Sequence, residues 1–232
     1  MPHFIADFQP VQSAQAAKAK GPLSREVRQL HIQYNKTKNR FPESTASKLI
    51  SQTVKSRSRR PITKLVSLGL GSLKSVDQSR RFKQLAIFLA IAEQLQQNGA
   101  RLDIYAQDPS FSKTDESFLQ SLGIQILSTP SPTNLGDAAQ YIDESTLVYS
   151  PFLTLEAYEL LFSSGTLSFF IGDDFDALRN KWPKHSASRN EAESLLKRFV
   201  KSYRKRAITI EEGFWEETDK SFPMAIYTAT SM

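Results

Sequence analysis

The sequence contains no cysteine, so disulfide bonds and thiolate chemistry are both excluded. It also lacks a long hydrophobic run, because the longest, Leu85 to Ala92, is far shorter than the roughly 20 residues that span a bilayer. The amino terminus has no apolar core of the kind found in a secretion signal. We therefore expect a protein of the cytoplasm, the nucleus or both, with no membrane partner.

Acidic residues are scarce at the start of the chain, where residues 1–60 hold 12 Lys or Arg and only 3 Asp or Glu. The other residues hold 18 basic and 21 acidic side chains, so the net charge of +6 comes from the first quarter of the sequence. A basic segment of this kind can bind nucleic acid, direct a protein to the nucleus or simply remain solvated. Few aromatic residues lie among the basic ones, so we consider nucleic-acid binding less well supported than the other functions discussed below.

The 232 residues suffice for one large α/β domain with an extension, and 40% of them are hydrophobic. We predict a partly disordered, partly helical extension over 1–60 and an α/β domain over 61–232. In the extension, residues 1–22 look disordered. A helix is predicted to follow a capping residue at Ser24 and to pack on the main domain, and a second helix is predicted over 44–54. Residues 55–60 are predicted to form a basic linker.

Strands and helices alternate through most of the second segment. Strands are predicted over 64–70, 101–106, 124–127, 146–149 and 167–171, with helices over 82–95, 112–122 and 155–162 and a helical turn within 137–143. A further helix is predicted to begin at a capping box of Ser188 and Glu191 and to run to about Arg206, before two closing strands over 207–210 and 224–228 that can form an antiparallel pair. This order predicts a Rossmann-like three-layer α/β/α sandwich around a mostly parallel sheet of about six or seven strands.

A ligand site is expected where the parallel strands end, since right-handed crossovers place all their carboxyl ends on one edge. The first strand ends in a turn with two glycines, which lets a ligand approach the backbone. Turns after three further strands complete this edge. The candidate ligand-binding residues are Gly69, Leu70, Gly71, Ser72, Asp108, Pro109, Ser150, Pro151, Gly172 and Asp173.

The ligand at this edge is less well defined than its place. The glycine turn suits a phosphate, a methionine group or an adenosine, and Asp108 is placed to bind ribose hydroxyls, so S-adenosylmethionine or another adenine nucleotide is the candidate cofactor. However, the motif is only Gly-x-Gly, and Asp108 follows Gly71 by 37 residues rather than the roughly 20 of a dinucleotide site. The alternative is a turn that merely lets strand and helix pack closely.

The other residues that could bind a metal or take part in catalysis are weaker candidates for a functional site. Asp173, Asp174 and Asp176 resemble a divalent-metal cluster, but an acidic group at a helix amino terminus explains them better, and no metal site is predicted. His185 lies beside Trp182 in a loop without an identified partner, which favours a surface histidine. No catalytic residue is identified.

From Leu65 onward the chain resembles the SRR1-like domain family, and its fungal members most. The resemblance covers roughly residues 40–175. It rests on Leu68-Gly69-Leu70-Gly71-Ser72, Ser79, Gln84-Leu85-Ala86, Tyr105, Asp108-Pro109-Ser110-Phe111, Asp115, Leu119 and Gly123, and more loosely on Tyr149-Ser150-Pro151-Phe152 and Ile171-Gly172-Asp173. Family members tend to carry a histidine or cysteine near Pro151, which this chain lacks.

The resemblance implies a Rossmann-like regulatory protein with no settled catalytic activity, in a family tied to circadian and light responses in plants, and elsewhere to haem biosynthesis and microtubule-related phenotypes. We therefore expect a non-catalytic regulator that binds a small molecule or a protein partner. Two alternatives stay open: an S-adenosylmethionine-dependent methyltransferase-like enzyme, and a nucleic-acid binder acting through residues 1–60.

Overall fold

The computed structural model describes residues 23–42, 44–55, 61–97, 101–129, 134–165, 167–208, 214–216, 219 and 223–230. The disorder expected in residues 1–22 and most of the basic linker over 55–60 lie outside these described residues. No helix in the described part of the chain combines the length and the apolar character needed to cross a bilayer.

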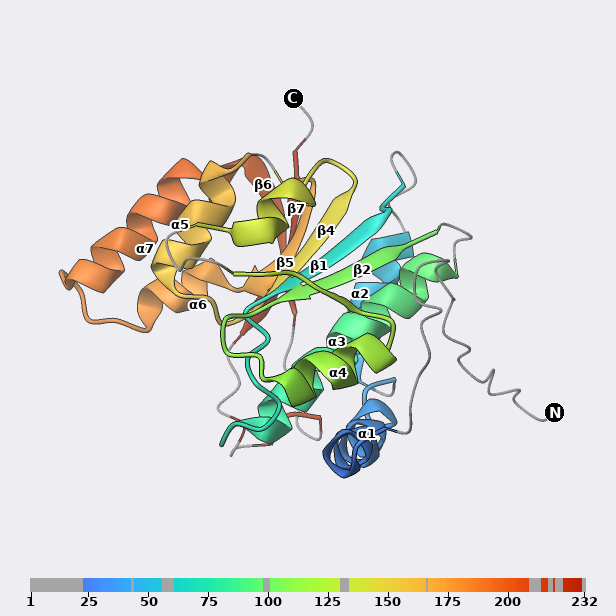
Figure 1. Cartoon of the computed structure of the whole chain (residues 1–232). Helices are drawn as coiled ribbons and strands as arrows, with labels where there is room; N and C mark the ends of the chain where they lie inside the picture. The colour runs from blue at the N-terminus through green and yellow to red at the C-terminus, as the bar shows by residue number, and fades with distance from the viewer. Residues whose placement is uncertain are drawn as a thin grey trace.

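Seven strands form one sheet in the described chain, in the order β3-β2-β1-β4-β5-β7-β6 (Figure 1). The first five strands in this order pair in parallel, whereas β7 runs antiparallel to both β5 and β6. The predicted antiparallel closing pair is therefore present. The strands are β1 (Lys64–Leu68), β2 (Asp103–Gln107), β3 (Gln125–Ile126), β4 (Thr146–Ser150), β5 (Phe169–Asp173), β6 (Tyr203–Ile208) and β7 (Met224–Ala229).

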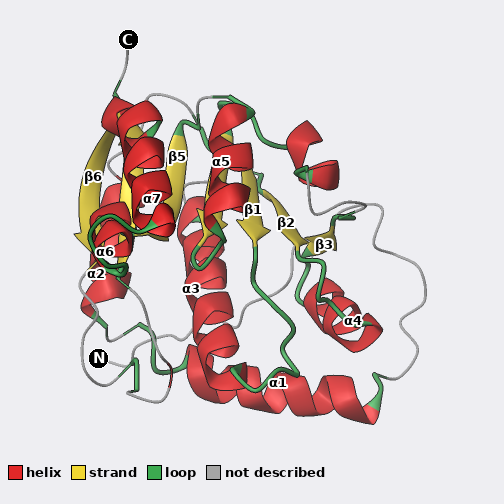
Figure 2. Ribbon diagram, turned by 90° about the vertical axis from the view of Figure 1, so that its left-hand side faces the viewer, coloured by secondary structure: helices red, strands yellow, loops and turns green. Residues whose placement is uncertain are grey.

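Helices cover both faces of the sheet, which confirms the predicted three-layer α/β/α sandwich (Figures 1 and 2). One layer contains α1 (Arg25–Lys38), α2 (Thr45–Lys55), α3 (Gln78–Gln96) and α4 (Lys113–Ser121). The other contains the short helix η1 (Gly136–Gln140), α5 (Leu155–Ser163), α6 (Phe175–Asn180), α7 (Ala187–Arg198) and η2 (Val200–Ser202).

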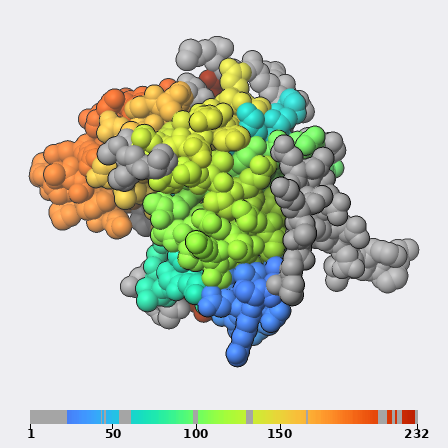
Figure 3. All heavy atoms as spheres, viewed as in Figure 1, coloured from blue at the N-terminus to red at the C-terminus, as the bar shows by residue number. Residues whose placement is uncertain are grey.

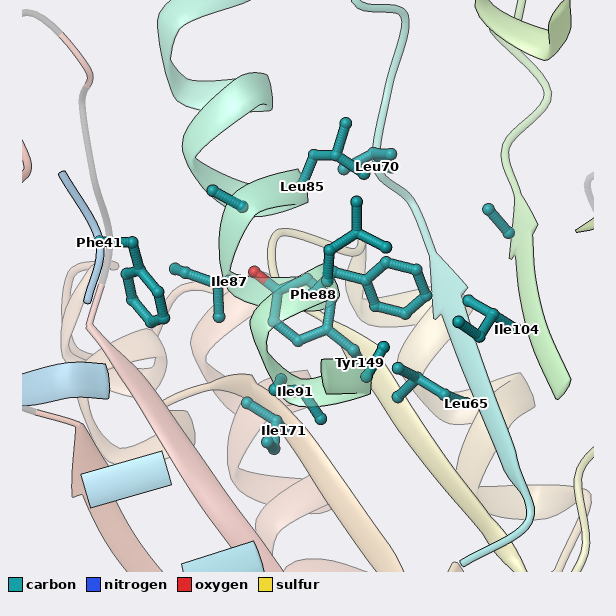
Figure 4. Close-up of a cluster of buried hydrophobic side chains, with 14 of the residues drawn as sticks. Phe41, Leu65, Leu70, Leu85, Ile87, Phe88, Ile91, Ile104, Tyr149 and Ile171 are labelled. Atoms are coloured by element: carbon teal, nitrogen blue, oxygen red, sulfur yellow. The ribbon is translucent and has the colours of Figure 1, made fainter. Parts of the chain in front are cut away.

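Helix α3 is buried on nearly all sides because it lies between the sheet and the amino-terminal helices. Phe88 packs on Tyr149 of β4 with ring centroids 5.7 Å apart, in the cluster shown in Figure 4. Val27 and Leu30 of α1 join the same core cluster from outside. Burial of each large apolar side chain contributes about 1.5–3 kcal/mol. Residues 85–92 of α3 are apolar all round because both sides of this part of the helix are covered.

The helical prediction for the extension is confirmed for its described part. Helix α1 begins after Ser24, whose Oγ accepts a hydrogen bond from the Val27 N–H at 3.2 Å. His31 on the same helix lies 2.8 Å from the hydroxyl of Ser121 at the end of α4, which ties α1 to the main domain. The division of the chain at residue 60 stays a prediction.

The helix predicted from Ser188 to about Arg206 is wrong at both ends. It begins after Ser186, whose Oγ accepts a hydrogen bond from the Arg189 N–H, and ends at Arg198. The basic residues that follow belong to edge strand β6, where alternation places Tyr203 and Lys205 on one face and exposes Arg204. Charged side chains on an edge strand oppose pairing with other chains, so this composition suits a strand as well as a helix end.

Candidate functional site

The glycine turn leaves β1 at its carboxyl end, and both glycines have positive φ angles, +74° at Gly69 and +76° at Gly71. Such angles strain other residues, so glycine is required by the backbone conformation itself. The turn is fastened to the end of β2. Asp108 Oδ2 accepts a hydrogen bond from the Gly71 N–H at 2.7 Å, and Ser110 Oγ accepts one from the Ser72 N–H at 3.0 Å.

A second carboxylate, that of Asp115 at the start of α4, also forms hydrogen bonds with the glycine turn. Its side chain is fully buried and accepts hydrogen bonds from the hydroxyl of Ser72 at 2.8 Å and from the Leu73 N–H at 3.0 Å. It also closes the capping box of α4 with Ser112. Asp108 and Asp115 therefore hold the glycine turn in one conformation.

Two side chains cover the glycines. A Cβ atom on Gly69 would lie 2.5 Å from Leu153 Cδ2, and one on Gly71 would lie 2.5 Å from Arg81 Cζ. Arg81, in the first turn of α3, is half-buried, and its Nε has no hydrogen-bond partner among the described residues. Burial and the neighbouring charge of Arg80 lower the pKa of Arg81 from its ordinary value. A ligand that approaches the glycine backbone must therefore meet or displace this guanidinium.

The turn after β4 contains a strained backbone position. Phe152 has a φ of +70°, which is uncommon for a residue with a side chain. Its N–H donates a hydrogen bond of 3.0 Å to Asp173 Oδ1 at the end of β5, and the guanidinium of Arg80 lies 5.1 Å from its ring centroid. These contacts hold the turn in the strained conformation and place Leu153 over Gly69.

Asp173 is the most perturbed acid at this edge. Its side chain is buried, and burial raises its pKa to about 6. The charge of Asp173 adds to burial in raising the pKa of Tyr149 well above its usual range. The Tyr158 hydroxyl donates to the Ser150 carbonyl at 2.7 Å and accepts from the Asp173 N–H at 3.3 Å, linking the ends of β4 and β5.

Several polar atoms near this edge are buried without a hydrogen-bond partner in the described structure. Unpaired buried donors and acceptors are costly, so each of them marks a place where a water or a ligand group improves the hydrogen bonding. The atoms are Ser67 Oγ, Tyr149 Oη, Ser150 Oγ, Arg81 Nε and Gln84 Nε2.

The structure brings the predicted edge residues together in two groups. Gly71 and Ser72 join Asp108 and its turn, and Ser150 joins Asp173 through Tyr158. The other candidates are placed as follows: Leu70 is buried in the core, Pro109 is exposed, Pro151 is buried, and Gly172 lies inside the sheet opposite Ser150 and Ala225. Ligand binding by all of these residues stays a prediction.

The acidic residues after β5 have the structural role that the sequence favoured. Asp174 caps α6 by accepting hydrogen bonds from the N–H groups of Asp176 and Ala177. Lys205 contacts the carboxylates of both Asp174 and Asp176. Within the described residues, no cluster of three or more potential metal ligands occurs.

Sequence reasoning placed Phe152 in a turn of this edge but missed Arg81 and Leu153. The paired arginines at 80 and 81 were a visible signal, because two adjacent cations at the amino-terminal end of a helix oppose its dipole. No comparable signal exists for Leu153, since its position over Gly69 depends on how two turns meet in space.

Comparison with known proteins gives matches of two kinds, and no curated protein matches the chain. Among solved structures, cofactor-bound Rv0187 from MTB has a TM-score of 0.49 at 10% identity, covering 89% of this chain and 90% of that one. A putative O-methyltransferase from Klebsiella pneumoniae has a TM-score of 0.49 at 10% identity over 90% and 92%. The SAH-bound methyltransferase PaMTH1 from Podospora anserina has a TM-score of 0.45 at 12% identity over 87% and 88%.

These structures are similar to the chain in fold alone, and we draw no functional conclusion from them. The sequence match is more specific, because the model of the SRR1 domain covers residues 37–227, well over half of the chain. The match extends beyond both ends of residues 40–175, the segment over which the sequence resembles this family. The protein therefore belongs to the SRR1 domain family.

Proposed function

We propose that this protein is a non-catalytic regulator that binds a small anionic ligand at the carboxyl edge of β1 and β4. The observation that carries the proposal is the guanidinium of Arg81, half-buried against Gly71 with its Nε unpaired. A guanidinium offers a planar fork of donors that matches a carboxylate or a phosphate. An anion at this position would accept a hydrogen bond from the unpaired Nε of Arg81 and would neutralise the half-buried positive charge of its guanidinium.

The acids of the edge support a binding role rather than a catalytic one. Asp108, Asp115 and Asp173 each accept a backbone N–H from a turn, so each carboxylate already positions the chain. The family resemblance extends the proposal to regulation of circadian and light responses or of haem biosynthesis, with ligand binding as the regulatory input. A protein partner that reads the conformation of the edge, and action in the cytoplasm or the nucleus, belong to the same proposal.

A methyltransferase-like enzyme that uses S-adenosylmethionine is the second candidate. The antiparallel pair β6 and β7 beside an otherwise parallel sheet, together with the glycine turn, favours it. The state of Asp108 counts against it, because its carboxylate accepts hydrogen bonds from the Gly71 N–H and from both the N–H and the hydroxyl of Ser110. Ribose hydroxyls would have to compete with these bonds, and Arg81 would have to move.

Calorimetric titration of the full chain with S-adenosylmethionine, S-adenosylhomocysteine, ATP, AMP and inorganic phosphate tests the proposal. At least one anion should bind, and Arg81→Gln should weaken binding about tenfold or more, as expected for loss of a charge-assisted contact. Arg204→Gln on the exposed face of β6 is the matched control and should leave affinity unchanged. Absence of binding by the whole panel, or equal affinity in Arg81→Gln, contradicts the proposal. Methyl transfer from S-adenosylmethionine to any acceptor would favour the enzyme instead.

A further inference from the structure

Positive charge in the main domain is concentrated in one segment. Residues 174–208, which form α6, α7, η2 and β6, hold ten Lys or Arg and four Asp or Glu. The rest of 61–232 holds eight basic and seventeen acidic residues. This basic segment, orange in Figure 3, lies at one side of the molecule. Its charge is therefore distinct from that of the basic amino-terminal segment.

A cavity of about 490 Å³, broadly open to solvent, lies within this basic segment, between α6, α7 and β6. Small-molecule sites in proteins measure about 300–1,000 Å³, so its size suits a metabolite. One wall comes from α6, and a second comes from one face of α7 and the following η2. The floor comes from one face of β6. The lining residues are Asp176, Arg179, Glu193, Leu196, Lys197, Val200, Lys201, Tyr203 and Lys205.

The charges that line this cavity are only partly neutralised. Lys205 forms ion pairs with Asp174 and Asp176, and Glu193 forms one with Arg189, with 3.2 Å between Arg189 Nε and Glu193 Oε1. In contrast, Lys197 and Lys201 are exposed and have no acidic partner among the described residues.

Arg179 adds a third cation that is weakly paired. Its nearest acidic atom, Asp176 Oδ1, is 3.9 Å away, and Asp176 is already in contact with Lys205. The Nε of Arg179 is buried without a hydrogen-bond partner in the described structure. The cavity therefore presents one guanidinium and two ammonium groups to an occupant, a set that favours phosphate oxygens.

The rest of the lining is apolar. Leu196 and Val200 project from α7 and η2, and the ring of Tyr203 lies beside them. The Tyr203 hydroxyl accepts a hydrogen bond from the Leu167 N–H at 3.0 Å, which fixes the ring in place. A preformed apolar and aromatic surface beside cations suits a ligand that has an apolar body as well as a charge.

We propose that the cavity between α6, α7 and β6 binds an organic phosphate, with its phosphate on Arg179, Lys197 and Lys201 and its apolar body on Leu196, Val200 and Tyr203. This site is separate from the carboxyl-edge site at the glycine turn. In the sheet, β4, β5 and β7 lie between β1, which carries that turn, and β6, which forms the cavity floor. The proposal therefore does not depend on the function proposed above.

Calorimetric titrations of the full chain with ADP, with monomeric lysophosphatidic acid and with inorganic phosphate test this proposal and distinguish a nucleotide from a lipid phosphate. At least one organic phosphate should bind more tightly than inorganic phosphate, because only it fills the apolar part. The double variant Lys197→Gln, Lys201→Gln should weaken that binding about tenfold or more through loss of two charge contacts. Both lysines are exposed, so the thermal unfolding midpoint should change little.

The double variant Lys184→Gln, Arg204→Gln is the matched control, because it removes the same two charges at exposed positions that do not line the cavity. It should retain the affinity of the unmodified chain within about twofold, since neither side chain lines the cavity and exposed charges are screened by salt. Equal weakening in both double variants, tighter binding of inorganic phosphate, or no binding of either organic phosphate overturns the proposal. Loss of binding in Arg81→Gln alone would assign the ligand to the carboxyl edge and also overturn it.

Discussion

Asp173 links the turn after β4 to β5, and it should make the protein less stable as the pH rises. Burial raises its pKa from the ordinary 3.8 to about 6 in the folded chain. Between these values the unfolded chain loses the proton first, so ionisation favours unfolding. The contribution of protonated Asp173 to the free energy of unfolding is therefore fully present below pH 3.8 and is lost as the pH rises through 6. A difference of about two pKa units corresponds to about 3 kcal/mol.

The variant Asp173→Asn isolates this effect. Its side-chain oxygen can still accept the hydrogen bond from the Phe152 N–H, but no proton is lost. The free energy of unfolding of Asp173→Asn, relative to that of the unmodified chain, should rise by about 2–3 kcal/mol between pH 4 and pH 7.5.

Urea unfolding followed by circular dichroism at several pH values measures this difference. Glu191→Gln on α7 serves as the control that removes a carboxylate elsewhere. If Asp173→Asn and the unmodified chain show the same pH dependence, the carboxylate of Asp173 does not lie in the buried environment that the reasoning requires.

Three further variants test the packing around the site by chemical denaturation. Gly71→Ala should destabilise the fold by about 1–2 kcal/mol because alanine is strained at the positive φ of this position, and its Cβ should displace Arg81. Unchanged stability would contradict this. Lys83→Met should destabilise by about 3–5 kcal/mol because Lys83 forms a buried ion pair with Asp219, and adding Asp219→Asn should recover part of the loss; an additive loss would be evidence against the pair. Asp115→Ala should destabilise by about 3 kcal/mol because buried donors lose their acceptor; a change below about 0.5 kcal/mol would refute that role.

Much of the fold could be predicted because alternating apolar strands and helices are a local signal. The run from Lys64 to Leu68 is followed by glycines, so both the strand and its turn were readable. Basic residues near 204–206 misled the prediction, since a helix end and an edge strand both accept them. Edge strands depend on their neighbours in the sheet, which a local pattern does not reveal.

The candidate site was predictable in its location but not in its contacts. Parallel topology alone brings Gly71 and Asp108 to one edge, and the structure joins them by a hydrogen bond of 2.7 Å. The sequence suggested that Asp108 would bind ribose, whereas the structure shows its carboxylate occupied by the turn itself. The position of Arg81 over Gly71 depends on the direction in which α3 leaves the turn, and no spacing rule predicts it.

The most direct test of the carboxyl-edge site is a crystal structure of the full chain soaked separately with S-adenosylmethionine and with ATP. Our account predicts density for one of these ligands beside Gly71, with its carboxylate or phosphate in contact with the guanidinium of Arg81. Absence of density for both ligands beside Gly71, with Arg81 unchanged over an empty edge at saturating ligand, would contradict the account.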